Sequence, residues 1–209
     1  VRLVNKPESP DTPFMADLLR RAALTVFDWS DDFETFASGE DERLLTRRIC
    51  DRYLRACDLT LAVNDRLGER ARRSSPAAHV VRNGTDVQSF GRVLTGDVEM
   101  APQLRGLPHP IVGYVGYRVG ERLDLELIDF LAGARPEWTF AFVGPRVGEE
   151  PLKDLIVRRR NIRLVDPVDY FDLPSIVAAF DACILPNRIN VHTAGNDPIK
   201  LYDYLAAGK

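Results

Sequence analysis

A loop-to-helix transition near the end of the sequence carries residue types that could bind a phosphate group. Asn196 closes the loop, Asp197 is a typical helix N-cap, and Pro198 suits the first helical position, where a missing N–H costs nothing. The next N–H groups, from Ile199 onward, would point out of the helix at the positive end of its dipole. Lys200 adds a cation in the first turn. This segment therefore predicts a seat for a phosphate or a pyrophosphate.

The helix behind this start is expected to carry an acid and an apolar seam. Asp203 would stand near the same helix end, where its carboxylate could accept hydrogen bonds from sugar hydroxyls. Leu201, Tyr204 and Leu205 are expected to face the core, because they recur at helical spacing. Gly208 is expected to end the helix.

The elements that must position these residues alternate along the chain. Short apolar runs predict strands at residues 24–27, 59–63, 79–81, 111–116, 138–143, 162–165 and 182–185. Amphipathic stretches predict helices at residues 11–21, 41–57, 66–73, 123–134, 150–160, 173–180 and 198–207. This alternation favours an α/β fold in which helices cover both faces of parallel sheets.

Glycine and proline residues concentrate between the two halves of the chain. We therefore expect two Rossmann-like domains, at residues 1–95 and 111–209, joined by a linker over residues 96–110. In this arrangement the second domain would hold the phosphate seat, and the first would supply the other side of a site.

The composition is that of a globular protein, with 45% hydrophobic residues in a chain of 209 and a net charge of -3. So mild a charge argues against a nucleic-acid partner. Arginines cluster at residues 43–55, 66–73 and 158–160, either as solvated helix faces or as a surface for anionic lipid head groups or a polyanionic acceptor. The three cysteines lack zinc-site spacing and are expected to be small buried residues in a reducing compartment. No run is long enough to span a bilayer, and none resembles a signal peptide.

The final segment, residues 198–209, resembles the nucleotide-sugar site of GT-B glycosyltransferases, in particular family 4. Members often show Pro-x-Lys-Leu-x-Glu-Tyr-Leu-Ala-x-Gly-Lys-Pro there. Residues 80–90, centred on Asn83-Gly84-Thr85-Asp86, resemble the Val-x-x-Asn-Gly-x-Asp-x-x-x-Phe motif that ends the first domain of these enzymes. Together with the strand-like runs of the second half, the resemblance covers about residues 20–209. It implies a GT-B fold whose two Rossmann-like domains are both incomplete in this chain.

The resemblance implies a hexosyltransferase-like enzyme that moves a sugar from a nucleotide-diphosphate sugar to a glycan or lipid-linked acceptor. It implies retention of the anomeric configuration, no metal ion and no other cofactor. A role in cell-surface polysaccharide or glycolipid biosynthesis is expected, in the cytoplasm, with peripheral contact at the inner face of the membrane. Two alternatives stay open: a non-catalytic nucleotide-binding protein of the same fold, and a sugar-nucleotide epimerase.

Three residues are candidates for catalysis. Lys200 would stabilise the charge that develops on the departing diphosphate, as a site without a metal requires. Arg118 is preferred over Arg122 as a second cation from the loop after the first strand of domain two. In the first domain, Asp28 opens an acidic loop, residues 28–32, and could contact the acceptor or act as a base. A metal site in that loop is the less favoured reading, and an exposed loop is an equal alternative.

The remaining candidates would bind the donor. Gly116 would let the backbone approach the diphosphate, and Gly144 and Pro167 follow neighbouring strands at the edge of the sheet where open α/β folds bind ligands. Together with residues 196–199 at the start of the last helix, these residues would form the donor site.

The sequence matches the family's acidic pair only in part. In the family, the acid at the position of Asp203 holds the donor ribose, and a glutamate lies eight positions earlier. That earlier position is Gly195 here, with Asp197 as a possible partial substitute. The absence of the glutamate favours the non-catalytic alternative.

Overall fold

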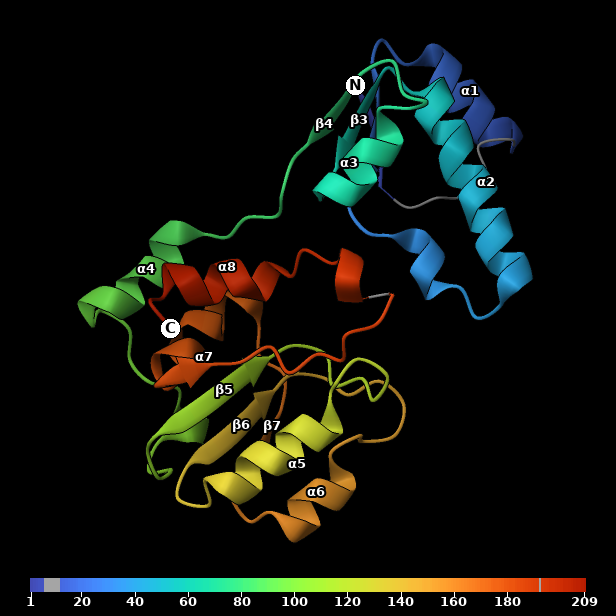
Figure 1. Cartoon of the computed structure of the whole chain (residues 1–209). Helices are drawn as coiled ribbons and strands as arrows, with labels where there is room; N and C mark the ends of the chain where they lie inside the picture. Colours follow the sequence, from blue (N-terminus) through green and yellow to red (C-terminus); the bar gives the residue numbers. More distant parts are fainter. Residues whose placement is uncertain (6–11, 192) are drawn as a thin grey trace. The chain divides into compact units, whose positions relative to one another are not determined.

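The computed structural model describes residues 1–5, 12–191 and 193–209. These residues form two compact units (Figure 1). Unit 1 comprises Val1–Asn83 and Ile189–Asp197, and unit 2 comprises Gly84–Arg188 and Pro198–Lys209. Each unit contains one four-stranded parallel sheet, which confirms the α/β class expected from the alternation of the sequence.

The sheet of unit 1 has the strand order β1-β2-β3-β4. Its strands are β1 (Arg2–Val4), β2 (Thr25–Trp29), β3 (Leu59–Ala62) and β4 (Ala78–Val80). Its α-helices are α1 (Pro13–Arg21), α2 (Glu40–Ala56) and α3 (Asp65–Ala71), and a 3-10 turn, Phe33–Phe36, precedes α2. The core is aromatic, because Phe27 on β2 stacks on Tyr53 of α2 with ring centroids 5.4 Å apart, and Trp29 is fully buried beside them.

The sheet of unit 2 has the strand order β7-β6-β5-β8. Its strands are β5 (Ile111–Val115), β6 (Thr139–Val143), β7 (Ile162–Val165) and the short β8 (Ala182–Cys183). Its α-helices are α4 (Val87–Thr95), α5 (Leu125–Ala134), α6 (Lys153–Arg158), α7 (Leu173–Ala178) and α8 (Ile199–Ala206). Because neighbouring side chains of a strand point to opposite faces, Phe140 and Phe142 join the core beneath α5 and α6, and Ala141 joins the core on the opposite face with Phe180.

The units group the chain differently from the expected division at residues 96–110. Helix α4 belongs to unit 2, because Phe90 is buried with Val177 of α7, with Tyr204 of α8, and with Ala207, which caps α8. Residues 189–197 belong to unit 1, although they lie between β8 and α8 in the sequence. We call residues 189–197 the strap. The chain consequently changes units three times.

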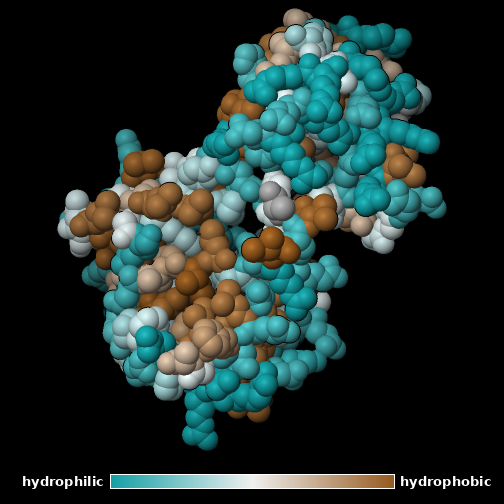
Figure 2. All heavy atoms as spheres, in the orientation of Figure 1, coloured by the Kyte–Doolittle hydropathy of each residue, from teal (hydrophilic) through white to brown (hydrophobic). Residues whose placement is uncertain are grey.

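The apolar seam predicted for α8 was partly wrong. Tyr204 is buried as expected, and Gly208 ends the helix with a φ of +69°. Leu201 and Leu205, however, are 38% and 64% exposed. The buried face is instead formed by Asp203, Tyr204 and Ala207, and Figure 2 shows hydrophobic atoms on the surface over α7 and α8.

The cysteines are free thiols. Cys50 and Cys57 are buried, as expected, and burial raises their pKa values to about 12 and about 11, so both thiols stay protonated near neutral pH. Cys183 is half-buried. Within the described ranges, no helix is both long enough and apolar enough to cross a membrane.

Candidate functional site

The strands β5 and β6 of unit 2 both end in a glycine that no other residue could replace without strain. Gly116 has a φ of +145° and Gly144 a φ of +131°. The Gly116 N–H donates to the carbonyl of Val143 at 2.9 Å. A Cβ placed on Gly144 would lie 2.4 Å from the carbonyl oxygen of Gly116. The two glycines therefore bring bare backbone together at the carboxyl edge of the sheet, as the sequence predicted.

Lys200, in the first turn of α8, lies directly over this glycine edge. Its Nζ is 2.9 Å from the position that a Cβ on Gly116 would occupy, and 5.3 Å from the centroid of the Tyr114 ring. Burial lowers the pKa of Lys200, the positive charge of Arg122 lowers it further, and the Asp203 carboxylate opposes both effects. The site thus holds a partly desolvated cation beside exposed backbone, a suitable place for an anion.

Asp203 stands one turn further along α8 and is only 6% exposed. The Thr85 hydroxyl donates to its Oδ1 at 2.5 Å. Burial raises the pKa of Asp203, whereas the hydrogen bond from Thr85 and the charge of Lys200 lower it. A carboxylate and an ammonium group therefore lie on one face of α8 and interact with each other.

Arg118 has a structural place, which the sequence did not predict. Its side chain is buried: Nε donates to Glu150 at 2.9 Å, and Nη1 donates to the carbonyls of Gly144 and, at 3.2 Å, Val165. The guanidinium therefore ties together the loops that follow β6 and β7. Arg118 is thus engaged within unit 2, whereas Arg122 is the arginine whose charge acts on Lys200.

The start of α8 differs from the expected cap. The N-cap residue is Pro198, which offers no side-chain hydrogen bond, and the helix begins at Ile199. Asp197 lies one residue before the N-cap position; its carboxylate accepts from the Asn83 N–H at 2.9 Å and its carbonyl accepts from Asn83 Nδ2 at 2.6 Å. The helix therefore begins one residue later than predicted, and Asn83, which contacts Asp197, lies 114 residues earlier in the sequence.

The strap, which precedes α8 in the sequence, contacts other residues of unit 1. Asn64, which also caps α3 through the Leu67 N–H, donates from Nδ2 to the carbonyl of Gly195 at 2.5 Å. A Cβ on Gly195 would lie 3.4 Å from Arg66 Nη1 and 3.7 Å from Asp32 Oδ2. Position 195 thus closely approaches two charged side chains of unit 1. Next to it, Asn196 carries a buried Oδ1 that has no hydrogen-bond partner within the described residues.

Pro167 and Asp28, two further candidates from the sequence, lie in other segments of the chain than Lys200. Pro167 lies exposed in the loop after β7, on the expected edge of the sheet. The prediction that Asp28 opens a loop was wrong. Strand β2 runs to Trp29, and Asp28 pairs with Leu61 of β3. Asp28 is half-buried, and burial raises its pKa.

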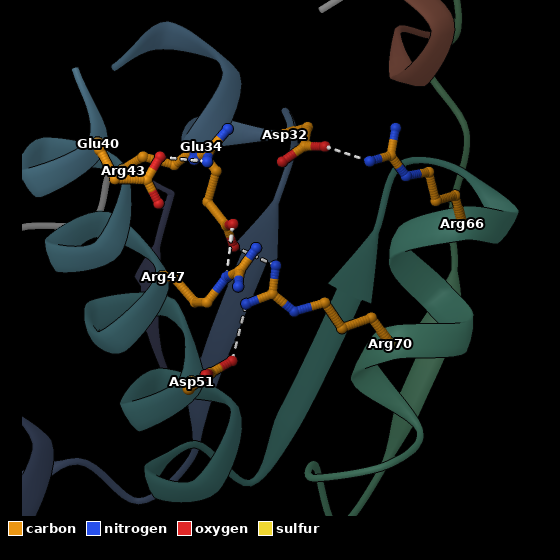
Figure 3. Close-up of polar contacts among 8 residues, drawn as sticks. All are labelled: Asp32, Glu34, Glu40, Arg43, Arg47, Asp51, Arg66 and Arg70. Carbon is orange, nitrogen blue, oxygen red and sulfur yellow. Dashed lines mark hydrogen bonds and ion pairs between the residues drawn. The ribbon is translucent and has the colours of Figure 1, made fainter. Parts of the chain in front are cut away.

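The buried acids of unit 1 are Asp32, which belongs to the acidic loop noted in the sequence, and Glu34, which the sequence analysis did not single out (Figure 3). Glu34 pairs with Arg47 of α2 at 2.9 Å and with Arg70 of α3. Arg70 also pairs with Asp51 at 2.8 Å.

These ion pairs show that two of the arginine clusters are partly internal rather than wholly solvated faces. Arg66 lies 3.5 Å from Asp32, and Arg70 stacks over the Trp29 ring with its guanidinium carbon 5.0 Å from the centroid. Across the part of the chain that the structure describes, no group of three or more His, Cys, Asp or Glu side chains is arranged to hold a metal ion.

Two parallel sheets covered by helices, one in each unit, define the class: the chain has the GT-B fold. The solved structures that it resembles include HepE of Anabaena in complex with UDP, with a TM-score of 0.68, 17% identity, and coverage of 94% of this chain and 54% of that one. A trehalose 6-phosphate synthase from Burkholderia multivorans matches with a TM-score of 0.59, 13% identity, and coverage of 92% and 51%.

A relative in sequence is the "Putative teichuronic acid biosynthesis glycosyltransferase TuaH" of Bacillus subtilis, 29% identical over 136 residues. That match covers 63% of this chain and 32% of the relative. No protein-family profile matches the chain. The chain thus corresponds to about a third of the curated relative and about half of each solved chain. The resemblance to GT-B glycosyltransferases that the sequence indicated is confirmed.

Proposed function

We propose that the protein transfers a sugar from a nucleotide-diphosphate sugar to a glycan or lipid-linked acceptor, in the biosynthesis of a cell-surface polysaccharide or glycolipid. The observation that carries this proposal is the position of Lys200 over the bare backbone of Gly116. HepE was solved with UDP and with UDP-glucose, and TuaH is described as a teichuronic acid glycosyltransferase, which supports a nucleotide-sugar donor and a polysaccharide context.

In this proposal the donor diphosphate binds where α8 begins. The first N–H groups of a helix have no acceptor within that helix, and Ile199 is half-exposed, so these groups are suited to an anion. Lys200 compensates the negative charge that grows on the diphosphate as the sugar leaves. Gly116 and Gly144 allow the phosphates to approach the backbone, and Asp203 accepts hydrogen bonds from the ribose. Pro198 and Pro167 complete the proposed donor site in unit 2.

On the acceptor side, Asp28 is retained as a candidate base or acceptor contact. Burial raises the pKa of the Asp28 carboxyl group, which favours uptake of a proton. We further propose that transfer retains the anomeric configuration and needs no metal ion. The N–H groups at the helix end and the ammonium group of Lys200 would stabilise the diphosphate in place of a metal ion. NMR of the product's anomeric proton and an assay in EDTA test these two points. An inverted product, or activity lost in EDTA, would contradict them.

The donor-site assignment is tested by replacing Asp203 with asparagine, which keeps the shape of the side chain and removes its charge. Hydrogen bonds to a charged group contribute about 1.5–3 kcal/mol, so we expect Asp203→Asn to weaken nucleoside diphosphate binding by roughly 10- to 100-fold. Isothermal titration calorimetry with UDP, ADP and GDP measures this. Asp154→Asn, a change at an exposed acid of α6, is the matched control. Equal affinity in the wild type and Asp203→Asn would remove Asp203 from the site.

The non-catalytic alternative stays in view because Gly195 has no side chain where the related enzymes carry a glutamate. The assay that separates the two functions is slow donor hydrolysis without an acceptor. A transferase releases nucleoside diphosphate from its matching sugar donor, whereas a binding protein leaves the donor intact. Binding with no release from any of a panel of UDP-, ADP- and GDP-sugars would support the binding protein.

Peripheral membrane contact is proposed for the outer face of α2. This face exposes Leu45 at 58% together with the arginines Arg48, Arg52 and Arg55. A basic residue near an anionic membrane contributes about 1 kcal/mol, so the double change Arg48→Gln and Arg55→Gln should weaken binding to phosphatidylglycerol vesicles by roughly tenfold or more. Vesicle sedimentation measures this, with Arg105→Gln in unit 2 as the control. Absence of binding between the wild-type protein and these vesicles would contradict the proposal.

A further inference from the structure

Thr85 connects the first sequence motif to the proposed donor site. It lies in the Asn-Gly-Thr-Asp turn immediately before α4, and its hydroxyl donates to Oδ1 of Asp203 at 2.5 Å across 118 positions of sequence. Both residues belong to unit 2. The hydroxyl therefore reaches the acid that is proposed to hold the donor ribose.

The turn that carries Thr85 is held in place by the start of α4. Asp86 caps α4 by accepting from the N–H groups of Gln88 and Ser89, each at 3.1 Å, and from the Ser89 hydroxyl at 2.6 Å. Phe90, one turn into α4, is buried against Tyr204, the residue after Asp203. Thr85 is thus a fixed donor rather than a side chain on a free loop.

Only one oxygen of the Asp203 carboxylate is used by this contact. Among the residues that the structure describes, no hydrogen bond reaches Oδ2 of Asp203. This oxygen is also not among the polar side-chain atoms that are fully buried without a hydrogen-bond partner. A ligand hydroxyl can therefore reach Oδ2 while Thr85 holds Oδ1.

We infer that Thr85 is a positioning residue for nucleotide binding: its hydroxyl fixes the Asp203 carboxylate so that Oδ2 meets the ribose hydroxyls of the donor. This inference rests on the proposed function of the site. A carboxylate that is already fixed loses less rotational freedom when the ligand binds, so the ligand binds more tightly.

The same hydroxyl lowers the pKa of Asp203 and so favours the carboxylate. Burial raises the pKa of Asp203, and the hydrogen bond from Thr85 is the largest of the effects that lower it. The charge of Lys200 also lowers this pKa, and Arg122 acts on Lys200 in turn. Tyr204 is buried next to Asp203, and its hydroxyl oxygen accepts from the Val115 N–H at 2.7 Å. Burial raises the pKa of Tyr204, so this residue stays neutral. Loss of the Thr85 hydroxyl should therefore raise the pKa of Asp203.

The test compares Thr85→Val, which keeps the shape of the side chain but removes the hydroxyl, with Thr85→Ser, which keeps the hydroxyl. Calorimetry with UDP, ADP and GDP is run from pH 5 to pH 8. The nucleotide that binds the wild type should bind Thr85→Val roughly 5- to 10-fold more weakly at pH 7, as expected for one lost hydrogen bond, and Thr85→Ser should recover most of the affinity. The loss of binding on the acid side should move to higher pH in Thr85→Val, because its carboxylate protonates earlier.

Inorganic pyrophosphate serves as a second probe, because it has no ribose. Its affinity should be the same in the wild type and Thr85→Val, whereas general damage to the fold would weaken both probes. Thr95→Val, at the other end of α4, is the matched control for a lost threonine hydroxyl.

Three results would overturn the inference. Unchanged nucleotide affinity and an unchanged pH profile in Thr85→Val would show that the hydroxyl does not position Asp203. Tighter binding would show that Thr85 competes with the ligand. If the wild type binds pyrophosphate but none of the nucleotides, Asp203 does not hold a ribose, and the proposed function fails along with the inference.

Discussion

Replacement of Lys200 by methionine is expected to lower the rate of sugar transfer by about 100- to 1000-fold. Removal of one preorganised group that stabilises developing charge has effects of this order in other enzymes. The ammonium group of Lys200 lies over Gly116, at the edge where the diphosphate is proposed to leave. Methionine keeps much of the apolar stem beside the Tyr114 ring, so the loss can be assigned to the charge. Initial rates with the matching donor and acceptor measure it.

Lys153→Met is the control for this result. Lys153 is an exposed lysine of α6, paired with Glu149 at 2.7 Å, and its removal should leave the rate unchanged. Thermal unfolding should show that both variants are folded, because burial already disfavours the charged form of Lys200. Transfer by Lys200→Met at half the wild-type rate would be incompatible with a catalytic role for the ammonium group.

Replacement of Gly144 by alanine is expected to lower the free energy of unfolding by about 3–5 kcal/mol, because strain and a clash combine. The φ of +131° is a conformation that residues with a side chain rarely adopt. The new Cβ would also lie 2.4 Å from the Gly116 carbonyl oxygen, and backbone cannot move aside as a flexible side chain can. Urea unfolding measures the change. Nucleotide affinity should fall as well, because Gly116 must shift.

Gly148→Ala, in the same loop, separates strain from the clash. Gly148 also has a positive φ, +73°, but nothing lies within 4 Å of its added Cβ. Its substitution should cost only about 1–2 kcal/mol, the penalty of the left-handed conformation. Equal destabilisation by the two changes would show that the contact between the strand ends is not tight.

The sequence predicted the sheets because their signal is local. Buried parallel strands need continuous apolar runs, and residues 139–143 and 111–115 supply them without any long-range information. Gly116, Gly144 and Lys200 were also predicted to lie together, because parallel strands place their carboxyl ends at one edge of the sheet. The exposed Leu201 and Leu205 show the limit of this approach, since periodicity identifies a seam but not which face another element covers.

The errors in the site came from residues whose partners are distant in sequence. Asp197 has the right type for a cap, but Asn83 engages it. Arg118 follows the glycine edge as a phosphate-binding arginine would, but Glu150 and two carbonyls bury it. In each case a local preference lost to a contact that only the folded chain creates.

The three changes of unit along the chain limit how such a protein can be altered by recombination. A segment such as residues 84–209 would include the strap but lack Asn64, which holds Gly195, and Asn83, which holds Asp197. If one unit were exchanged for the corresponding unit of another protein, the new segments would have to fit the chain at three junctions instead of one. Chimaeras with a single crossover at residue 83 should therefore fold poorly, and new pairings of donor and acceptor halves should arise by gradual substitution rather than by shuffling.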